Sequence, residues 1–312
     1  MQRTQAEAIR PRGIQFTLFT VVTACVLGAG VWHTYVAQSE LDEVKIEAQK
    51  VTDNLYMLTG AGGNMGVSLG EDGVFLIDDQ YGPLSDRIKA AIKELGGEAP
   101  AFLLNTHYHG DHMGGNAAFD ATTPILAHDN VRARLVSGHQ PFGDELKPAP
   151  PAALPDLTYS DTITLYFNGE KVEVVHYPSG HTDGDSVIFF TGSDVVHMGD
   201  DMFAGMFPFV DLGAGGSVQG AAANIEAILQ RVGPETKIIP GHGPLSSKAD
   251  LESYLVMLKK TTAMVQERMD AGQSLEQIKE AGLPAEWDAW GASFIKTDRW
   301  LETIHTSLTA AS

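Results

Sequence analysis

Three histidines and an aspartate lie within six residues of one another in this 312-residue chain, in the segment His107-Tyr108-His109-Gly110-Asp111-His112. Imidazole nitrogens and carboxylate oxygens are ligands that zinc and similar metal ions accept. Residues i and i+2 of an extended segment point the same way, so His107 and His109 can contact one ion together. Asp111 and His112 follow where the chain turns and can face a second position beside it. The spacing therefore predicts a metal site.

Further ligand-type residues follow three later strands that the sequence predicts. They are His181 after Gly180, Asp200 after Gly199, and His242 after Gly241. Glycine beside each ligand lets the backbone turn sharply and leaves room for an ion. A single Gly-His pair is equally well explained as a turn histidine. The recurrence of such pairs at the ends of apolar strands supports the metal interpretation.

The order and context of these motifs resemble the metallo-β-lactamase-fold hydrolase superfamily, over a stretch from about Asp53 to His242. The resemblance implies an α/β fold, an αββα sandwich, with a binuclear site for two Zn²⁺ ions at one edge of the sheets. His107, His109 and His181 would hold the first ion. Asp111, His112 and His242 would hold the second, and Asp200 would bridge both ions together with a hydroxide.

Two positions depart from the best-known lactamases. Those enzymes have a cysteine where this chain has Asp200, and a lysine three residues later, where this chain has Phe203. Asp200 instead resembles the bridging aspartate of the thioesterase, lactonase and phosphodiesterase branches. The departures predict weak or promiscuous β-lactam hydrolysis. The overall layout, with a possible export signal, is nevertheless more similar to periplasmic lactamase-like members than to cytosolic glyoxalases.

The residues and the resemblance together favour a zinc-dependent hydrolase that opens a cyclic amide or ester of a small-molecule substrate. Two neighbouring zinc ions lower the pKa of a bridging water to near neutrality, and the hydroxide would attack the carbonyl. Asp111 would also orient the nucleophile and relay its proton. Three alternatives stay open: a lactonase or thioesterase, a redox enzyme with iron or manganese, and a non-catalytic protein whose metal site is saturated.

An aromatic segment follows Asp200 and contains Phe203, Phe207 and Phe209. If the segment is a loop, these side chains line the substrate site beside the ions. If it packs over the sheet, they belong to the core. The sequence leaves both interpretations open.

The N-terminus differs in composition from the rest of the chain. Arg3, Arg10 and Arg12 precede the uncharged stretch 13–32, a pattern typical of an export signal. The stretch is also long enough to approach a membrane span. We therefore expect residues 1–37 to form a signal peptide or membrane anchor, and residues 45–312 to form one catalytic domain. The protein would be periplasmic or anchored to the outer face of the inner membrane.

Charge and cysteine content exclude several other classes. The chain has 21 basic and 40 acidic residues, a net charge of −19, which disfavours nucleic acid as a partner. Its single cysteine, Cys25, lies inside the expected signal. The exported body would then have no thiolate ligand or nucleophile, so any metal ion must be held by His, Asp or Glu.

Hydrophobic periodicity predicts two batches of strands, each followed by helices. Strands are expected at 51–58, 65–69, 74–78, 101–105, 124–127, 162–167, 172–177, 187–191, 195–198 and 237–239, and helices at 84–95, 218–232, 248–270, 274–281 and 296–308. The proline-rich stretch 139–155 indicates an exposed connection. This order favours two stacked sheets with helices on both outer faces and the site at the seam between halves.

Overall fold

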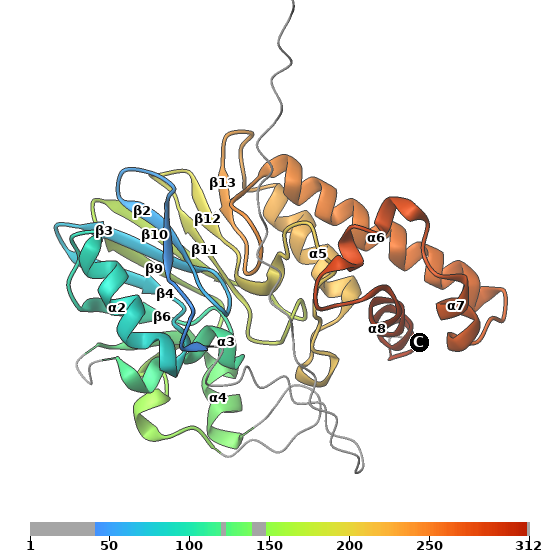
Figure 1. The fold of residues 1–312 in the computed structure, drawn as a ribbon, viewed down its shortest axis with the longest axis horizontal. Helices are drawn as coiled ribbons and strands as arrows, with labels where there is room; N and C mark the ends of the chain where they lie inside the picture. Colours follow the sequence, from blue (N-terminus) through green and yellow to red (C-terminus); the bar gives the residue numbers. More distant parts are fainter. Residues whose placement is uncertain (1–40, 120–122, 139–147, 311–312) are drawn as a thin grey trace, which may run out of the picture. The chain divides into compact units, whose positions relative to one another are not determined.

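The computed structural model describes residues 41–119, 123–138 and 148–310, which belong to one compact unit (Figure 1). The expected signal or anchor, residues 1–37, lies outside the described residues, as does the part 139–147 of the proline-rich connection. In the described part of the chain, no helix combines the length and apolar character that crossing a membrane requires.

The first sheet has seven strands in the order β1-β2-β3-β4-β6-β7-β8. The strands are β1 Glu47–Lys50, β2 Leu55–Thr59, β3 Met65–Gly70, β4 Gly73–Ile77, β6 Pro100–Leu104, β7 Ile125–His128 and β8 Leu157–Tyr159. Strands β1 to β4 pair antiparallel, whereas β4, β6, β7 and β8 run parallel. A short strand, β5 Gln80–Tyr81, follows β4 and bridges to residues 113–114.

The second sheet has six strands in the order β14-β13-β12-β11-β10-β9. The strands are β9 Thr162–Phe167, β10 Glu170–His176, β11 Ser186–Phe190, β12 Val195–His197, β13 Lys237–Ile239 and β14 Ser246–Ser247. Strands β12 and β13 are parallel, and the other neighbours are antiparallel. The two sheets therefore follow the two halves of the sequence, as the strand pattern predicts.

Alternating side chains of the strands build three apolar layers, because successive residues of a strand face opposite sides of its sheet. Phe75 and Ile188 point between the sheets. Their neighbours point outward: Leu76 packs on α2 (Ser85–Glu94), and Phe189 packs on the helices of the second half. The expected αββα sandwich is confirmed.

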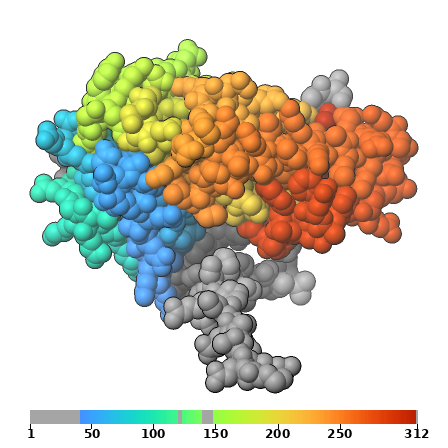
Figure 2. Space-filling view, turned by 90° about the horizontal axis from the view of Figure 1, so that it is seen from above, coloured from blue at the N-terminus to red at the C-terminus, as the bar shows by residue number. Residues whose placement is uncertain are grey.

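The outer face of the second sheet is covered by α5 (Val218–Leu229), α6 (Lys248–Asp270) and α8 (Thr297–Ala310). Figure 2 shows these C-terminal segments, orange to red, beside the rest of the unit. Three helices begin at a serine that accepts a hydrogen bond from the first turn, namely α5, α6 and α7 (Leu275–Ala281). Their bounds agree closely with the predicted ranges.

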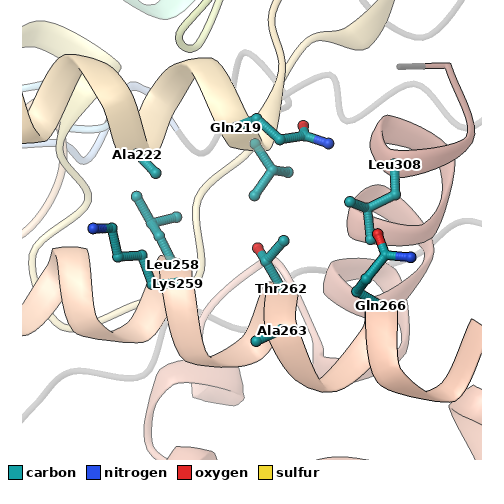
Figure 3. Close-up of a pocket in the computed structure, with 9 residues that line it drawn as sticks. Gln219, Ala222, Leu258, Lys259, Thr262, Ala263, Gln266 and Leu308 are labelled. Atoms are coloured by element: carbon teal, nitrogen blue, oxygen red, sulfur yellow. The ribbon is translucent and has the colours of Figure 1, made fainter. Parts of the chain in front are cut away.

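A cavity of about 310 Å³ lies among α5, α6 and α8 (Figure 3). Its lining is Val218, Gln219, Ala222, Leu258, Lys259, Thr262, Ala263, Gln266 and Leu308. None of the metal-ligand candidates is among these residues, so the cavity belongs to the helical layer.

Two local predictions were wrong. In the expected strand 51–58, only the part from Leu55 onward is extended, as β2; residues 51–54 form the turn that connects β1 to β2, in which the Thr52 hydroxyl accepts a hydrogen bond from the amide of Leu55. No helix was expected after β7, yet α4 spans Asp129–Ser137. The His128 side chain caps it by accepting a hydrogen bond from the Asn130 amide, a role that histidine seldom signals in sequence.

Candidate metal centre

Four strands deliver the ligand candidates to one edge of the sandwich. His107 follows β6 in the first sheet, whereas His181, Asp200 and His242 follow β10, β12 and β13 in the second. His109 directly precedes the short helix α3 (Gly110–Met113), which contains Asp111 and His112. The structure brings all seven candidates together in two adjoining groups.

The first group comprises His107, His109, His181 and Asp200, all buried. The Nδ1 atom of His109 lies 3.1 Å from Nε2 of His107 and 2.8 Å from Nε2 of His181. Oδ2 of Asp200 lies 3.4 Å from Nε2 of His181 and 3.8 Å from Nε2 of His107. Three ring nitrogens and one carboxylate oxygen thus converge on one point.

The second group comprises Asp111, His112 and His242. Nε2 of His242 lies 3.4 Å from Oδ2 of Asp111 and 3.4 Å from Nε2 of His112. The side chains of Asp111 and His242 are 25% and 20% exposed, while that of His112 is fully buried. The site therefore opens to solvent on the side of the second group.

Asp200 presents one carboxylate oxygen to each group. Oδ2 faces the first group, and Oδ1 lies 3.0 Å from Nε2 of His112 and 3.4 Å from Nε2 of His242. Oδ1 is buried, and despite these short distances no donor among the described residues reaches it with hydrogen-bond geometry. A buried carboxylate oxygen without such a partner is costly unless it binds a cation. This orphaned atom and the nitrogen-oxygen donor set fit divalent metal ions.

The buried carboxylate of Asp78 anchors the segment that contains His107 and His112. Nδ1 of His112 lies 2.7 Å from Oδ2 of Asp78, and Thr106 donates to Asp78 through both its amide and its hydroxyl at 2.7 Å. Nδ1 of His107 in turn lies 3.0 Å from the Thr106 hydroxyl oxygen. Both histidines therefore donate through Nδ1, which leaves the Nε2 lone pair for an ion.

The other two histidines of the first group are held in the same manner. Nδ1 of His181 lies 2.8 Å from the backbone oxygen of Phe209, and Nε2 of His109 lies 3.1 Å from Oδ2 of Asp211. His109 is thus turned so that Nδ1, rather than Nε2, faces the ion position. The Tyr108 hydroxyl also donates to Asp211, at 2.5 Å.

Two glycines allow the backbone to approach the ligands closely. A Cβ atom at Gly63 would lie 2.0 Å from Cε1 of His112, and one at Gly241 would lie 2.1 Å from Oδ1 of Asp200. Backbone hydrogen bonds hold the Gly63 segment in place, from Gly63 to Asp111 and from Asn64 to Gly241. Any side chain at Gly63 or Gly241 would therefore displace a ligand.

The electrostatics of the site favour positive charge between the groups. Burial would raise the pKa of Asp200, but the surrounding histidines hold it well below its usual range. Burial lowers the pKa of His181 to about 4, so that its ring is neutral and its Nε2 lone pair is available. For His242 the nearby carboxylates of Asp200 and Asp111 outweigh burial and raise the pKa to about 9. A metal ion would supply the positive charge that these carboxylates attract.

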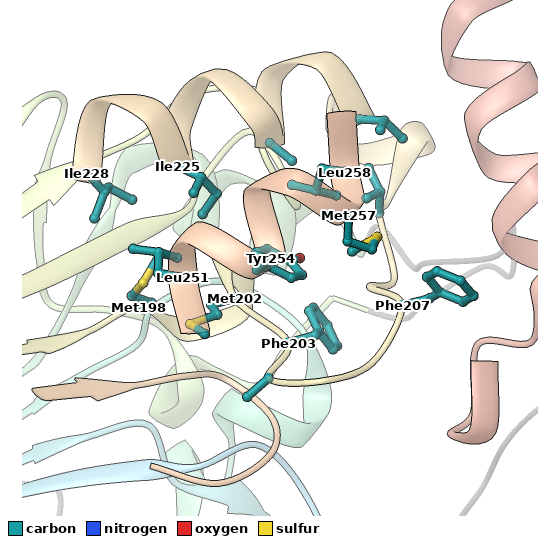
Figure 4. Close-up of a cluster of buried hydrophobic side chains, with 14 of the residues drawn as sticks. Met198, Met202, Phe203, Phe207, Ile225, Ile228, Leu251, Tyr254, Met257 and Leu258 are labelled. Atoms are coloured by element: carbon teal, nitrogen blue, oxygen red, sulfur yellow. The ribbon is translucent and has the colours of Figure 1, made fainter. Parts of the chain in front are cut away.

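The aromatic residues after Asp200 divide between site and core. The Phe209 ring centroid lies 5.6 Å from that of His109 and 5.7 Å from that of His181. Phe203 is fully buried and stacks on His242 with centroids 5.0 Å apart. Phe207 lies in the apolar cluster of the helical layer (Figure 4), 5.6 Å from the ring of Trp300.

For Phe207 the structure therefore supports core packing, the second of the two interpretations that the sequence left open. Its backbone amide donates to the oxygen of Trp290, which directs this part of the segment toward the C-terminal helices. Its side chain is fully buried there. Periodicity could not distinguish these alternatives, because the partners come from a distant part of the chain.

Two further residues at the site were not singled out from the sequence. Asp211 lies in an apolar stretch, where a lone carboxylate is a weak signal of a buried partner. Phe294 lies 6.4 Å from His242 between ring centroids and has no sequence signal, because it follows the last ligand by a long helical segment.

Comparison with known proteins agrees with this geometry. The sequence model of the metallo-beta-lactamase superfamily matches residues 58–242, more than half of the chain, and the chain belongs to this superfamily. The matched range includes all seven ligand candidates.

Among curated relatives, the chain is similar to two proteins named hydroxyacylglutathione hydrolase. It is 25% identical to that of Methylococcus capsulatus over 209 residues, 65% of this chain and 69% of the relative. It is 27% identical to that of Xylella fastidiosa strain M23 over 194 residues, 60% of this chain and 62% of the relative. The superfamily, these relatives and the His/Asp cluster identify the chain as a metal-dependent hydrolase.

Solved structures share the fold at low sequence identity. A metallo-beta-lactamase from Pontibacter korlensis superposes with a TM-score of 0.58 at 18% identity, covering 69% of this chain and 99% of that one. The inverting sec-alkylsulfatase of a Pseudomonas species superposes with a TM-score of 0.64 at 17% identity, covering 86% of this chain and 51% of that one.

Proposed function

We propose that this protein hydrolyses an ester or thioester of a small molecule, using two divalent metal ions. The position of Asp200 carries the proposal, since one oxygen faces each group of ligands and Oδ1 is otherwise orphaned. The names of the curated relatives support the thioester alternative over the cyclic amide that the sequence analysis placed first.

The two groups divide the ions between them. His107, His109 and His181 would hold the first ion and Asp111, His112 and His242 the second, with Asp200 shared. Zinc is the metal that this donor set suits best, with iron or manganese as the alternative. When bound, a pair of divalent ions polarises a substrate carbonyl and lowers the pKa of water, so that water attacks at neutral pH.

The protein side chains position the reactants and handle the proton. Asp111 is 25% exposed, compared with 5% for Asp200, so its carboxylate is the one that water and substrate reach. We assign Asp111 the task of orienting the attacking water and accepting its proton. Asp78 and Asp211 keep the imidazoles of His112 and His109 in fixed orientations during this step. A thiolate leaving group departs without needing a proton.

The test is Asp200→Asn, compared with the wild type after both are loaded with zinc. We expect two zinc ions per wild-type chain and steady hydrolysis of an acyl thioester. The variant should hold fewer ions and lose at least 10²-fold in kcat/KM, the scale on which removal of a key electrostatic group acts. Full activity in wild-type protein that elemental analysis finds free of metal would refute the proposal.

A further inference from the structure

Phe294 is an aromatic side chain held at the open side of the metal centre. It is 58% exposed, and its ring centroid lies 6.4 Å from that of His242 and 6.3 Å from that of Phe203. His242 belongs to the group of ligands that solvent reaches. Phe294 therefore stands at the rim through which a substrate must approach.

The segment that carries Phe294 is fixed rather than loose. It lies between the short helix η8 (Trp290–Ala292) and α8, and the next residue, Ile295, is buried in the helical layer. The Lys296 ammonium donates to the Ala292 oxygen, and the Trp300 amide donates to the Lys296 oxygen. These contacts hold the segment so that the Phe294 ring stays exposed to water beside the site. In the free protein, burial of the ring therefore contributes little to stability.

This placement distinguishes Phe294 from the other exposed large apolar residues. In the described ranges these are Val136, Leu157, Tyr166 and Val256. Phe294 lies beside a ligand candidate, with its ring next to that of His242. Tyr166, which is 79% exposed on strand β9, provides a natural control.

A second aromatic ring lies at the other group of ligands. Phe209 is half-buried, with its centroid 5.6 Å from that of His109 and 5.7 Å from that of His181. The centre is therefore flanked by Phe209 on the side of the first group and by Phe294 on the side of the second. Aromatic faces contribute apolar contact area at a binding site.

We propose that Phe294 determines specificity by packing against the apolar body of the acyl group. The preferred substrate is then an ester or thioester with an uncharged alkyl or aryl acyl group. The net charge of −19 also favours substrates with an uncharged acyl group, because it repels anionic substrates. This inference rests on the proposed hydrolase function and adds the class of substrate to it.

The experiment compares acyl thioesters that share one small, neutral leaving group, N-acetylcysteamine. Acetyl, hexanoyl and succinyl thioesters are assayed by thiol release with zinc-loaded wild type, Phe294→Ala, Phe294→Tyr and the control Tyr166→Ala. The readout is the ratio of kcat/KM for hexanoyl over acetyl, with KM and kcat determined separately. Zinc content and thermal unfolding of each variant are measured alongside.

We expect wild type to prefer the hexanoyl to both the acetyl and the succinyl thioester. Phe294→Ala should reduce the hexanoyl-to-acetyl ratio about tenfold, or ~1.4 kcal/mol, because it removes contact with roughly two methylenes. The lower kcat/KM for the hexanoyl thioester should come mainly from a higher KM, and the zinc content should be unchanged. Phe294→Tyr should retain the ratio, since the ring is kept, and Tyr166→Ala should leave it at the wild-type value.

The outcomes separate this inference from the proposed function. If fully loaded wild type releases no thiol from any of the three substrates, the proposed function is wrong and the inference falls with it. If wild type is active but Phe294→Ala lowers all three rates equally, or leaves the ratio unchanged, the role of Phe294 alone is refuted. A wild-type preference for succinyl over hexanoyl would also overturn it.

Discussion

Asp211 holds His109 in the orientation that a metal ion requires: Oδ2 of Asp211 lies 3.1 Å from Nε2 of His109. The contact turns Nδ1 of His109 toward Nε2 of His107 and Nε2 of His181. Asp211 lies just beyond the aromatic segment, so a loop from the second half of the chain orients a ligand from the first. Partners of this kind set the orientation and basicity of ligating histidines.

Replacing Asp211 should therefore weaken the first metal position without removing a ligand. We expect Asp211→Asn to lower zinc affinity about 10- to 100-fold, since the amide holds the ring less firmly. Competition with a chromophoric chelator measures this change. Asp183→Asn serves as the control, because Asp183 pairs with Arg134 and contacts none of the ligand candidates in the described structure. Equal affinities for Asp211→Asn and wild type would contradict the prediction.

A methyl group at Gly63 should disrupt the second metal position. Its Cβ would lie 2.0 Å from the ring of His112, which is itself tied to Asp78, so either the ring or the loop must move. We expect Gly63→Ala to bind about one zinc ion per chain instead of two and to lose most activity.

Gly110→Ala is the matched control for that substitution, because nothing lies within 4 Å of a Cβ atom at Gly110 although it adjoins Asp111. Elemental analysis of both variants decides the question. A full complement of zinc in Gly63→Ala would show that the loop yields without displacing His112.

Two neighbouring phenylalanines should respond differently to truncation. Phe207 is fully buried against Trp300, so Phe207→Ala should reduce the free energy of unfolding by about 3–5 kcal/mol. Phe209 is half-buried beside His109, so Phe209→Ala should cost less stability and mainly raise KM. Denaturant unfolding and steady-state kinetics test the pair. The assignment of Phe207 to the core fails if its truncation leaves stability unchanged.

His176 should make stability fall in mild acid. Burial lowers its pKa from the ordinary value of 6.5, and the stacked ring of His128, with centroids 3.7 Å apart, adds to this effect. The folded state therefore binds fewer protons here than the unfolded state. The resulting stabilisation is present above pH 6.5 and is lost as the pH falls below that value.

The measurement compares wild type with His176→Phe in denaturant titrations at pH 7.5 and pH 5. The variant should lose less stability than wild type between the two pH values, because position 176 no longer titrates. Metal release affects both proteins alike and cancels in the comparison. An identical loss in both would exclude a contribution from His176.

The sequence by itself singled out the seven ligand candidates that the structure brings together, and most of the strands and helices that position them. Two-residue spacing places His107 and His109 on one side of an extended segment, and this requires no long-range information. Hydrophobic periodicity predicted most elements, since it is a local property of the chain. The glycines beside His181, Asp200 and His242 marked the points where the strands end in sharp turns.

Only the tertiary structure decided which aromatic and acidic residues surround the metal centre. Phe207 and Phe209 are two residues apart and equally apolar, yet one packs on Trp300 and the other lies beside His109. Phe294 reaches His242 because the C-terminal helices fold back over the second sheet. Such contacts depend on the packing of distant elements against one another, and local spacing contains no information about that packing.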